Sequence, residues 1–251
     1  MNPLLRERVD SGIEVLRLAR PAVRNALDTR LLDALEEALG ELADDRALHV
    51  LVISTTDPRA LCAGVDVSEA LTAEQGEVRM AAFGRFYEAL EAFPVPTIAV
   101  GVGHCVGGGA ELFAGTDLRV GGDNLKLAWA GARLGVPVGP ARLVPLVGES
   151  VAKGLILTGR VVGQEEAGRL GLLHATAPAD EAEAAALGLA RELAAHPRDG
   201  LVALKRLFRD GSGSPARVAA ENAALNSFQH HGGGLPQGPR RVVDPAGPGV
   251  G

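Results

Sequence analysis

The segment GGGAE at residues 107–111 combines residues that could do chemistry together. The apolar run at 96–100 is typical of a buried strand, and residues 110–114 are typical of the start of a helix. Glycines at such a junction let a ligand approach the backbone closely and leave N–H groups unpaired. Those N–H groups favour an anion or a developing oxyanion. Glu111 shares a helix face with Gly108, so the segment predicts an electrophilic hole beside a general base.

A second glycine-containing segment, LCAGVDV at residues 61–67, follows another apolar run and a polar turn. Gly64 permits an unusual turn that would leave the N–H of Val65 free to point into a cleft. Taken alone, small residues after a strand are typical of a tight loop. Paired with Gly108, Val65 predicts a two-donor oxyanion hole, in which loss of one donor costs on the order of 100- to 1000-fold in rate.

The elements that must position these residues alternate along the first half of the chain. Residues 13–18 alternate apolar and polar side chains, and 50–54 are continuously apolar, which favours strands. Leucines at helical spacing follow Asp28, which is a candidate N-cap. With the further alternation across 97–120, the pattern predicts an α/β fold with a mainly parallel sheet covered by helices.

The sequence predicts that the second half of the chain is mainly helical. Helices are expected at residues 143–157, 165–173, 180–195 (capped by Asp180), 197–208 and 216–229. Residues 1–190 are therefore predicted to form the core and 191–231 a C-terminal helical subdomain. Residues 232–251 contain seven glycines and four prolines, which favours a disordered tail.

Composition excludes several classes of function. The chain has 251 residues, 47% hydrophobic, with a formal net charge of −6, so it offers no electrostatic case for nucleic acid or an anionic membrane. No apolar run approaches the roughly 18 residues of a membrane span, and the N-terminus lacks a signal-peptide pattern. Cys62 and Cys105 have no metal-type spacing and are expected to be reduced thiols. A cytoplasmic protein is expected.

Four motifs in their order resemble the enoyl-CoA hydratase/isomerase (crotonase) superfamily. The resemblance covers about residues 13–178. The motifs are RNAL at 24–27, CAGVD at 62–66, GGGAEL at 107–112 followed by DLR at 117–119, and LTGR at 157–160 with EA at 166–167 and GL at 171–172.

That resemblance implies a ββα spiral core with C-terminal helices that drive assembly into a homotrimer or a dimer of trimers. It implies an acyl thioester of coenzyme A as substrate, and neither a metal nor a redox cofactor. The N–H groups of Val65 and Gly108 would bind the thioester oxygen, and Glu111 would be the acid/base. Positions matching the family's coenzyme A contacts are Arg24, Ala26, Ala63, Asp66 and Val67.

The chain departs from the resemblance at one position. Hydratases of the family hold a water between two glutamates, and the position expected for the second is Gly131, with no acidic residue between Asp123 and Glu149. A single base still suits a 1,3-proton shift. Among the possible reactions, we expect hydration or isomerisation of an enoyl-CoA first. Decarboxylation of a malonyl-type thioester is an alternative, with Arg133 either pairing with its carboxylate or lying on the surface. A catalytically weak acyl-CoA-binding protein is the other alternative.

Overall fold

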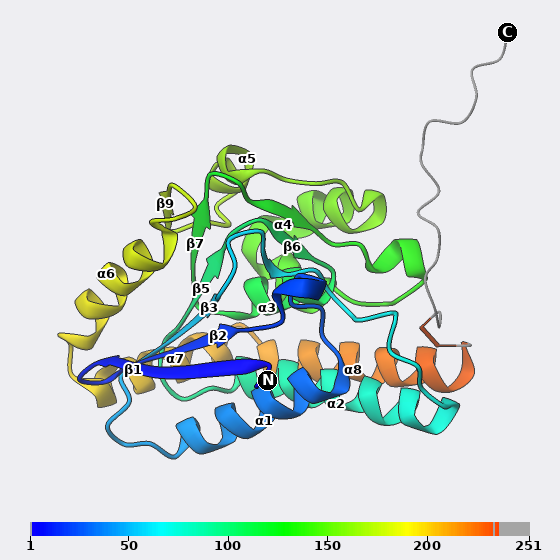
Figure 1. Ribbon diagram of the computed structural model, residues 1–251, viewed down its shortest axis with the longest axis horizontal. Helices are drawn as coiled ribbons and strands as arrows, with labels where there is room; N and C mark the ends of the chain where they lie inside the picture. The colour runs from blue at the N-terminus through cyan, green and yellow to red at the C-terminus, as the bar shows by residue number, and fades with distance from the viewer. Residues whose placement is uncertain (1, 233, 236–251) are drawn as a thin grey trace, which may run out of the picture.

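The computed structural model describes residues 2–232 and 234–235, and these build two sheets with covering helices (Figure 1). The larger sheet has the order β1-β2-β3-β5-β7-β9 and the smaller β4-β6-β8. Only β1 and β2 pair antiparallel; the other described pairs are parallel, as the sequence predicts. The strands are β1 (Leu4–Asp10), β2 (Ile13–Leu18), β3 (Val50–Thr55), β4 (Ala60–Cys62), β5 (Thr97–Gly101), β6 (His104–Val106), β7 (Leu118–Gly122), β8 (Lys126–Ala128) and β9 (Ala175–Ala177).

The chain repeats a strand–strand–helix unit. The units are β3–β4–α2 (Ala73–Glu91), β5–β6–α3 (Gly108–Gly115) and β7–β8–α4 (Pro140–Thr158). In each unit the first strand joins the larger sheet and the second the smaller one. This arrangement confirms the expected ββα spiral. It brings α3 into contact with β4 and β6 of the smaller sheet.

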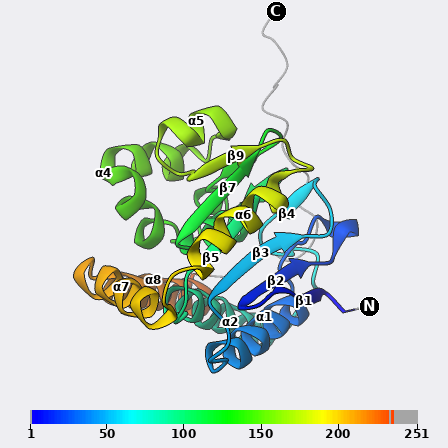
Figure 2. The same ribbon diagram turned by 90° about the vertical axis from the view of Figure 1, so that its left-hand side faces the viewer.

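Helices cover both faces of the larger sheet. On one face lies α1 (Thr29–Ala43), whose leucines are buried in the main core and whose N-terminus is capped by Asp28 through the N–H of Leu31 at 2.9 Å. On the other face, α6 (Ala182–Ala194) buries Ala182, Ala186 and Ala190 against strand valines and isoleucines (Figure 2).

The remaining helices complete the C-terminal half. They are α5 (Gln164–Arg169), α7 (Arg198–Gly211) and α8 (Ser214–His231), with short 3-10 turns η1 (Pro21–Val23) and η2 (Gly131–Leu134) earlier in the chain. Helix α8 runs beside α2 (Figure 1). Helix α4 includes a kink at Gly148, where φ is 76°.

Three details differ from the sequence-based expectations. Asp180 does not cap α6, because the N-cap is Glu181 and no side chain bonds the helix start. The helix expected at 165–173 ends at Arg169, since Leu170 is its C-cap and Gly171 is left-handed. The expected domain boundary at residue 190 falls within α6. The predicted tail at 232–251 lies mostly outside the described residues.

Candidate active site

Asn25 anchors the first loop of the site. Its side-chain amide donates to Thr55 Oγ1 at 2.8 Å and to the carbonyls of Ala60 and Leu61 at 3.0 and 3.1 Å. Its side-chain oxygen accepts from the N–H of Arg20 at 2.7 Å. Asn25 is fully buried and left-handed, with φ of 54°. These bonds fix the RNAL loop against the segment that follows β4.

The loop after β4 holds Val65 in a defined orientation. Leu27 donates to the carbonyl of Gly64 at 2.7 Å and accepts from the N–H of Asp66 at 2.9 Å. Gly64 has φ of 96°, and a Cβ there would lie 2.7 Å from the carbonyl oxygen of Val106. Glycine therefore permits both the turn and the approach to the β6–α3 junction. Within the described residues, no hydrogen bond from the N–H of Val65 is found.

The start of α3 presents the second N–H group. Gly107 has φ of 53° and donates to the carbonyl of Ala128 at 2.9 Å, while its own carbonyl accepts the N–H of Glu111 at 3.0 Å. No side chain caps this helix, and the N–H of Gly108 has no partner in the part of the chain that the structure describes. A Cβ at Gly109 would lie 2.1 Å from the carbonyl oxygen of Cys62, so glycine is required for α3 to pack on β4.

A cavity of about 280 Å³ opens between these two segments, and both Val65 and Gly108 line it. Its walls are mostly apolar and include Met80, Phe83, Leu134, Val136, Val138 and Leu225. None of its described lining residues is acidic or basic, and among them only the side chain of Tyr87 ends in a hydroxyl. The cavity therefore suits an apolar group adjoining two backbone donors.

Glu111 lies behind this cavity, not among its lining residues, and it has no solvent exposure. Its Oε2 accepts from Arg142 Nε at 2.5 Å, and Arg142 also donates to Glu221 on α8. Oε1 of Glu111 and Nη1 of Arg142 are buried without a hydrogen-bond partner among the described residues. Burial raises the pKa of Glu111 to about 7, opposed by Arg142 and reinforced by Glu221.

Glu221 ties the C-terminal helix to this cluster. Its Oε2 accepts from the backbone N–H of Gly139 at 3.0 Å and of Ala141 at 2.8 Å, at the start of α4. The acid thus satisfies donors at a helix N-terminus that has no side-chain cap of its own. As a result α3, α4 and α8 meet at one buried guanidinium.

The predicted coenzyme A positions lie around the mouth of the same region. Ala63 and Val67 line the cavity, Ala26 is buried, and the Arg24 side chain is exposed. The N–H of Ala63 donates to the carbonyl of Arg24 at 2.9 Å, which joins the two segments. Asp66 is also buried, where it accepts from Arg20 at 3.1 Å and from Ser68. The Asp66 carboxylate is therefore occupied by hydrogen bonds within the protein.

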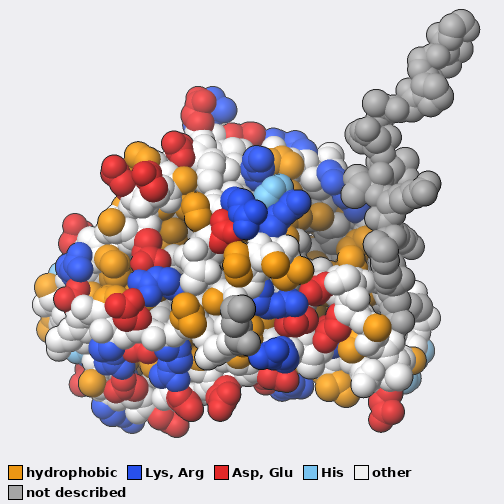
Figure 3. Space-filling model, in the orientation of Figure 1, with side chains coloured by type: hydrophobic (Ala, Val, Ile, Leu, Met, Phe, Trp, Pro, Cys, Tyr) orange, Lys and Arg blue, Asp and Glu red, His pale blue; other side chains and the backbone are white. Residues whose placement is uncertain are grey.

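Basic side chains gather near the exposed Arg24. His104 on β6 is paired in register with Lys126 on β8, and burial, Arg24 and Lys126 together lower the pKa of His104. The face shown in Figure 3 carries one gathering of basic side chains around a histidine, and elsewhere it mixes acidic and basic groups. Such a cluster is suited to a phosphate group.

The loop that begins at Gly131, where hydratases of the family carry their second glutamate, contributes no acidic side chain to the site. Gly131 lines the cavity, and a Cβ there would lie 2.9 Å from Val138 Cγ1 and 3.0 Å from the carbonyl oxygen of Val136. A glutamate would therefore require the loop to shift. Arg133 is exposed and donates to the carbonyl of Gly159 at 2.8 Å, so it lies on the surface and outside the cavity lining.

Helix α2 and the side chains of Tyr87, Arg142 and Glu221 were not predicted from the sequence. A signal for α2 was present, because Thr72 and Gln75 form a capping box at its start. Tyr87 lines the cavity from this helix, and the Arg142 guanidinium lies 4.3 Å from the centre of its ring. Arg142 is 31 positions from Glu111 and 79 positions from Glu221 in the sequence, so local sequence pattern does not reveal these contacts.

Other features of the described residues limit the chemistry further. Cys62 and Cys105 are free and buried, and burial raises the pKa of the Cys62 thiol to about 12, so both are poor nucleophiles. No described group of three or more His, Cys, Asp or Glu side chains is placed to hold a metal ion. No helix within residues 2–232 is long and apolar enough to cross a membrane.

The spiral of ββα units, with unpaired N–H groups from two glycine-containing turns beside an apolar cavity, defines a crotonase-type fold. The fold matches a solved "probable enoyl-CoA hydratase" of Mycobacterium thermoresistibile with a TM-score of 0.81 and 25% identity, covering 92% of this chain and 97% of that one. It also matches the Bacillus anthracis enoyl-CoA hydratase structure with a TM-score of 0.80 and 24% identity, covering 88% and 90%.

Sequence comparison gives the family. The model for "Enoyl-CoA hydratase/isomerase" matches residues 8–233. A "probable enoyl-CoA hydratase" of Mycobacterium tuberculosis is 33% identical over 206 residues, covering 79% of this chain and 80% of that protein. A mitochondrial relative from Arabidopsis thaliana is 34% identical, covering 73% of this chain and 63% of its own length, so this chain spans less than two thirds of it. The chain belongs to the enoyl-CoA hydratase/isomerase family.

Proposed function

We propose that this chain acts on an enoyl thioester of coenzyme A, as a hydratase or isomerase. The N–H groups of Val65 and Gly108 would bind the thioester oxygen. The observation that carries the proposal is that these two N–H groups, without partners among the described residues, belong to residues that line one cavity. Donors fixed in advance stabilise the charge that moves onto this oxygen when an enolate forms.

The lining of the cavity supports an apolar acyl group. No described lining residue carries a charge, so nothing in the wall would pair with a carboxylate on the substrate. Arg133, the side chain considered for that role, is bonded to Gly159 outside the lining. A malonyl-type substrate is therefore less well supported than an enoyl one.

Glu111 is the proposed acid/base. A pKa near 7 suits a group that takes and returns a proton at neutral pH, and the buried, unbonded Oε1 leaves one carboxyl oxygen available. Because Glu111 does not line the cavity in this structure, its use requires the side chain or the cavity wall to move. With Gly131 in the second position, a single carboxylate favours moving a proton between carbons over activating a water between two acids.

The coenzyme A portion is proposed to lie along Arg24, Ala26, Ala63, Asp66 and Val67. The positive charges of Arg24 and Lys126 near His104 support placing its phosphates there, because the charges complement each other. A homotrimer or dimer of trimers is proposed from the family resemblance. The proposed chemistry uses neither a metal nor a redox cofactor, since coenzyme A is part of the substrate.

A panel of 2-enoyl-, 3-enoyl- and malonyl-type coenzyme A thioesters, followed by mass spectrometry, tests this function. Wild-type protein should convert an enoyl thioester, and Glu111→Gln should lower kcat by about 100- to 10,000-fold, the usual contribution of a general base. Glu165→Gln, which changes an exposed glutamate on α5, is the matched control and should keep full activity. Binding without turnover across the panel would favour the acyl-CoA-binding alternative, and release of CO₂ would favour decarboxylation.

A further inference from the structure

We propose that Tyr87 is a further catalytic residue whose hydroxyl donates a hydrogen bond to the thioester oxygen, as a third donor beside Val65 and Gly108. This inference rests on the proposed function, because it assigns the hydroxyl to the same oxygen. It adds a side chain from α2 to a site that otherwise relies on backbone groups of two loops.

The position of the hydroxyl carries the inference. A Cβ built at Gly108 would lie 3.3 Å from Tyr87 Oη, so the hydroxyl lies over the first residue of α3. The other nearby atoms at that point are Leu27 Cδ1 at 3.0 Å and Phe83 Cε1 at 3.5 Å, and both are apolar. An oxygen bound by the Gly108 N–H would therefore find the hydroxyl as the neighbouring polar group.

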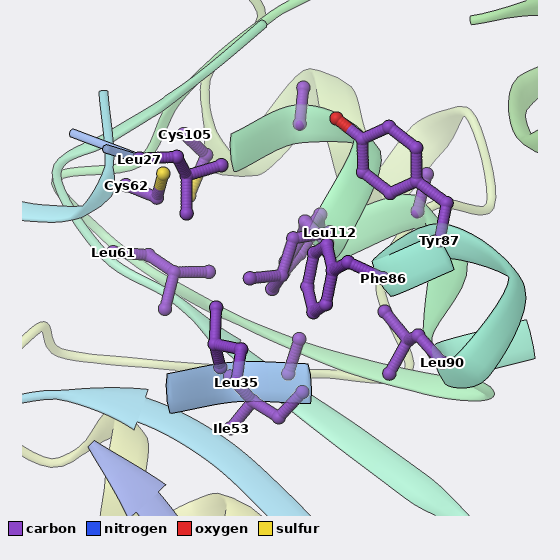
Figure 4. Close-up of a cluster of buried hydrophobic side chains, with 14 of the residues drawn as sticks. Leu27, Leu35, Ile53, Leu61, Cys62, Phe86, Tyr87, Leu90, Cys105 and Leu112 are labelled. Carbon is purple, nitrogen blue, oxygen red and sulfur yellow. The ribbon is translucent and has the colours of Figure 1, made fainter. Parts of the chain in front are cut away.

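The hydroxyl is also available to a ligand. Tyr87 is 4% exposed and lines the cavity, and within the described part of the chain its hydroxyl forms no hydrogen bond. Figure 4 shows this hydroxyl directed away from the buried cluster of Phe86, Leu90 and Leu112. The Tyr87 hydroxyl is not among the fully enclosed side-chain atoms that lack a partner, so it is accessible from the cavity and free to bond a ligand there.

The surroundings of the ring keep the hydroxyl a donor. Burial raises the pKa of Tyr87 well above 10, and Glu111 adds to this rise while Arg142 opposes it. The phenol is therefore protonated at neutral pH. The Arg142 guanidinium lies over the ring and is itself held by Glu111 and Glu221, which fixes the position of the ring. Its positive charge also favours negative charge on an oxygen that accepts from the hydroxyl.

The phenylalanine variant isolates the hydroxyl from the packing of the ring. Tyr87 packs against Phe86 and Phe83 with ring centres 5.5 and 6.0 Å away, and a phenylalanine keeps these contacts. Tyr87→Phe should therefore fold, and its thermal unfolding midpoint checks this.

The test compares an acyl-CoA thioester with its thioether analogue, which lacks the carbonyl oxygen, by calorimetric binding to wild type and Tyr87→Phe. We expect the variant to lose affinity for the thioester and to bind the thioether as wild type does. We also expect kcat on the best enoyl substrate to fall on the order of 100- to 1000-fold, since one donor to the oxyanion is lost. Equal thioester affinity and equal kcat in the two proteins would overturn the inference.

A second measurement uses the fact that Tyr87 is the sole tyrosine of the chain. Incorporation of 3-fluorotyrosine labels this one site, and its ¹⁹F resonance should shift when the thioester binds and shift differently with the thioether. The same ¹⁹F shift for both ligands would contradict a bond to the carbonyl oxygen. If wild type neither binds nor converts any thioester, the proposed function fails and this inference with it. Turnover by wild type that Tyr87→Phe retains removes only the role of Tyr87.

Discussion

At the scale of single residues, Glu111 combines full burial with one guanidinium shared between two acids. Arg142 bonds both Glu111 and Glu221, so two carboxylates compete for one cation in a place without solvent. Burying the second negative charge is costly, which is why the pKa of Glu111 rises to about 7. The same arrangement would let Glu111 hold a proton at neutral pH and release it to a substrate.

This pKa predicts opposite effects of pH on stability and on activity. The folded pKa of about 7 exceeds the ordinary value of 4.5, so the folded protein binds more protons than the unfolded chain between these values. The contribution of Glu111 to stability is fully present below about 4.5 and is lost as pH rises through about 7. Activity that needs the ionised base should rise as pH passes through about 7.

Urea unfolding of wild type and Glu111→Gln at pH 5 and pH 8 measures the effect on stability. We expect wild type to lose stability from pH 5 to pH 8 by more than the variant does. Glu165→Gln should follow wild type, because that glutamate is exposed. An identical pH dependence in wild type and Glu111→Gln would show that Glu111 titrates as it does in the unfolded chain.

At the scale of elements, local pattern predicted the strands at 13–18 and 50–54, the glycine turns and the helices corresponding to α3, α4 and α8, but it missed helix α2. Residues 13–18 and 50–54 coincide with β2 and nearly with β3, because apolar alternation and continuous burial leave a direct mark on sequence. Helix α2 has a weaker apolar periodicity, with charged residues interspersed among its buried ones. The meeting of α3, α4 and α8 at Arg142 depends on tertiary packing.

Helix α7 carries exposed apolar side chains that favour assembly of the protein. None of its residues is fully buried, and Leu204, Leu207 and Phe208 are exposed, the last two by 69% and 77%. Covering such side chains stabilises an assembly by roughly 1.5–3 kcal/mol each. The exposed side chains of α7 favour association, and the family resemblance gives the proposed trimer or hexamer. We expect that assembly by sedimentation velocity, and smaller species for the double variant Leu207→Ser/Phe208→Ser.

The control for this prediction is Val78→Ser, which removes an exposed apolar side chain from α2 instead. That variant should sediment as wild type does. A monomeric wild type at working concentration would contradict the proposed assembly, and an unchanged assembly in the double variant would place the interface elsewhere.

At the scale of the whole molecule, the spiral brings distant loops to one cavity. Each ββα unit turns the chain from the larger sheet to the smaller one, and the loops after β4 and β6 lie next to each other. Residues of α2 and α8 complete the lining of the cavity. The fold class and both glycine turns could be predicted from sequence motifs. The burial of Glu111 behind the wall could not, because it depends on Arg142 and Glu221 arriving from two later helices.

The proposed function requires this cavity to polarise a thioester carbonyl. Isotope-edited infrared spectroscopy of a bound acyl-CoA, ¹³C-labelled at the thioester carbonyl, measures that polarisation directly. Hydrogen bonds from Val65, Gly108 and Tyr87 would weaken the C=O bond, so we expect a carbonyl stretch at lower frequency than for the same thioester in water. A bound thioester whose carbonyl stretches at the frequency found in water would contradict it.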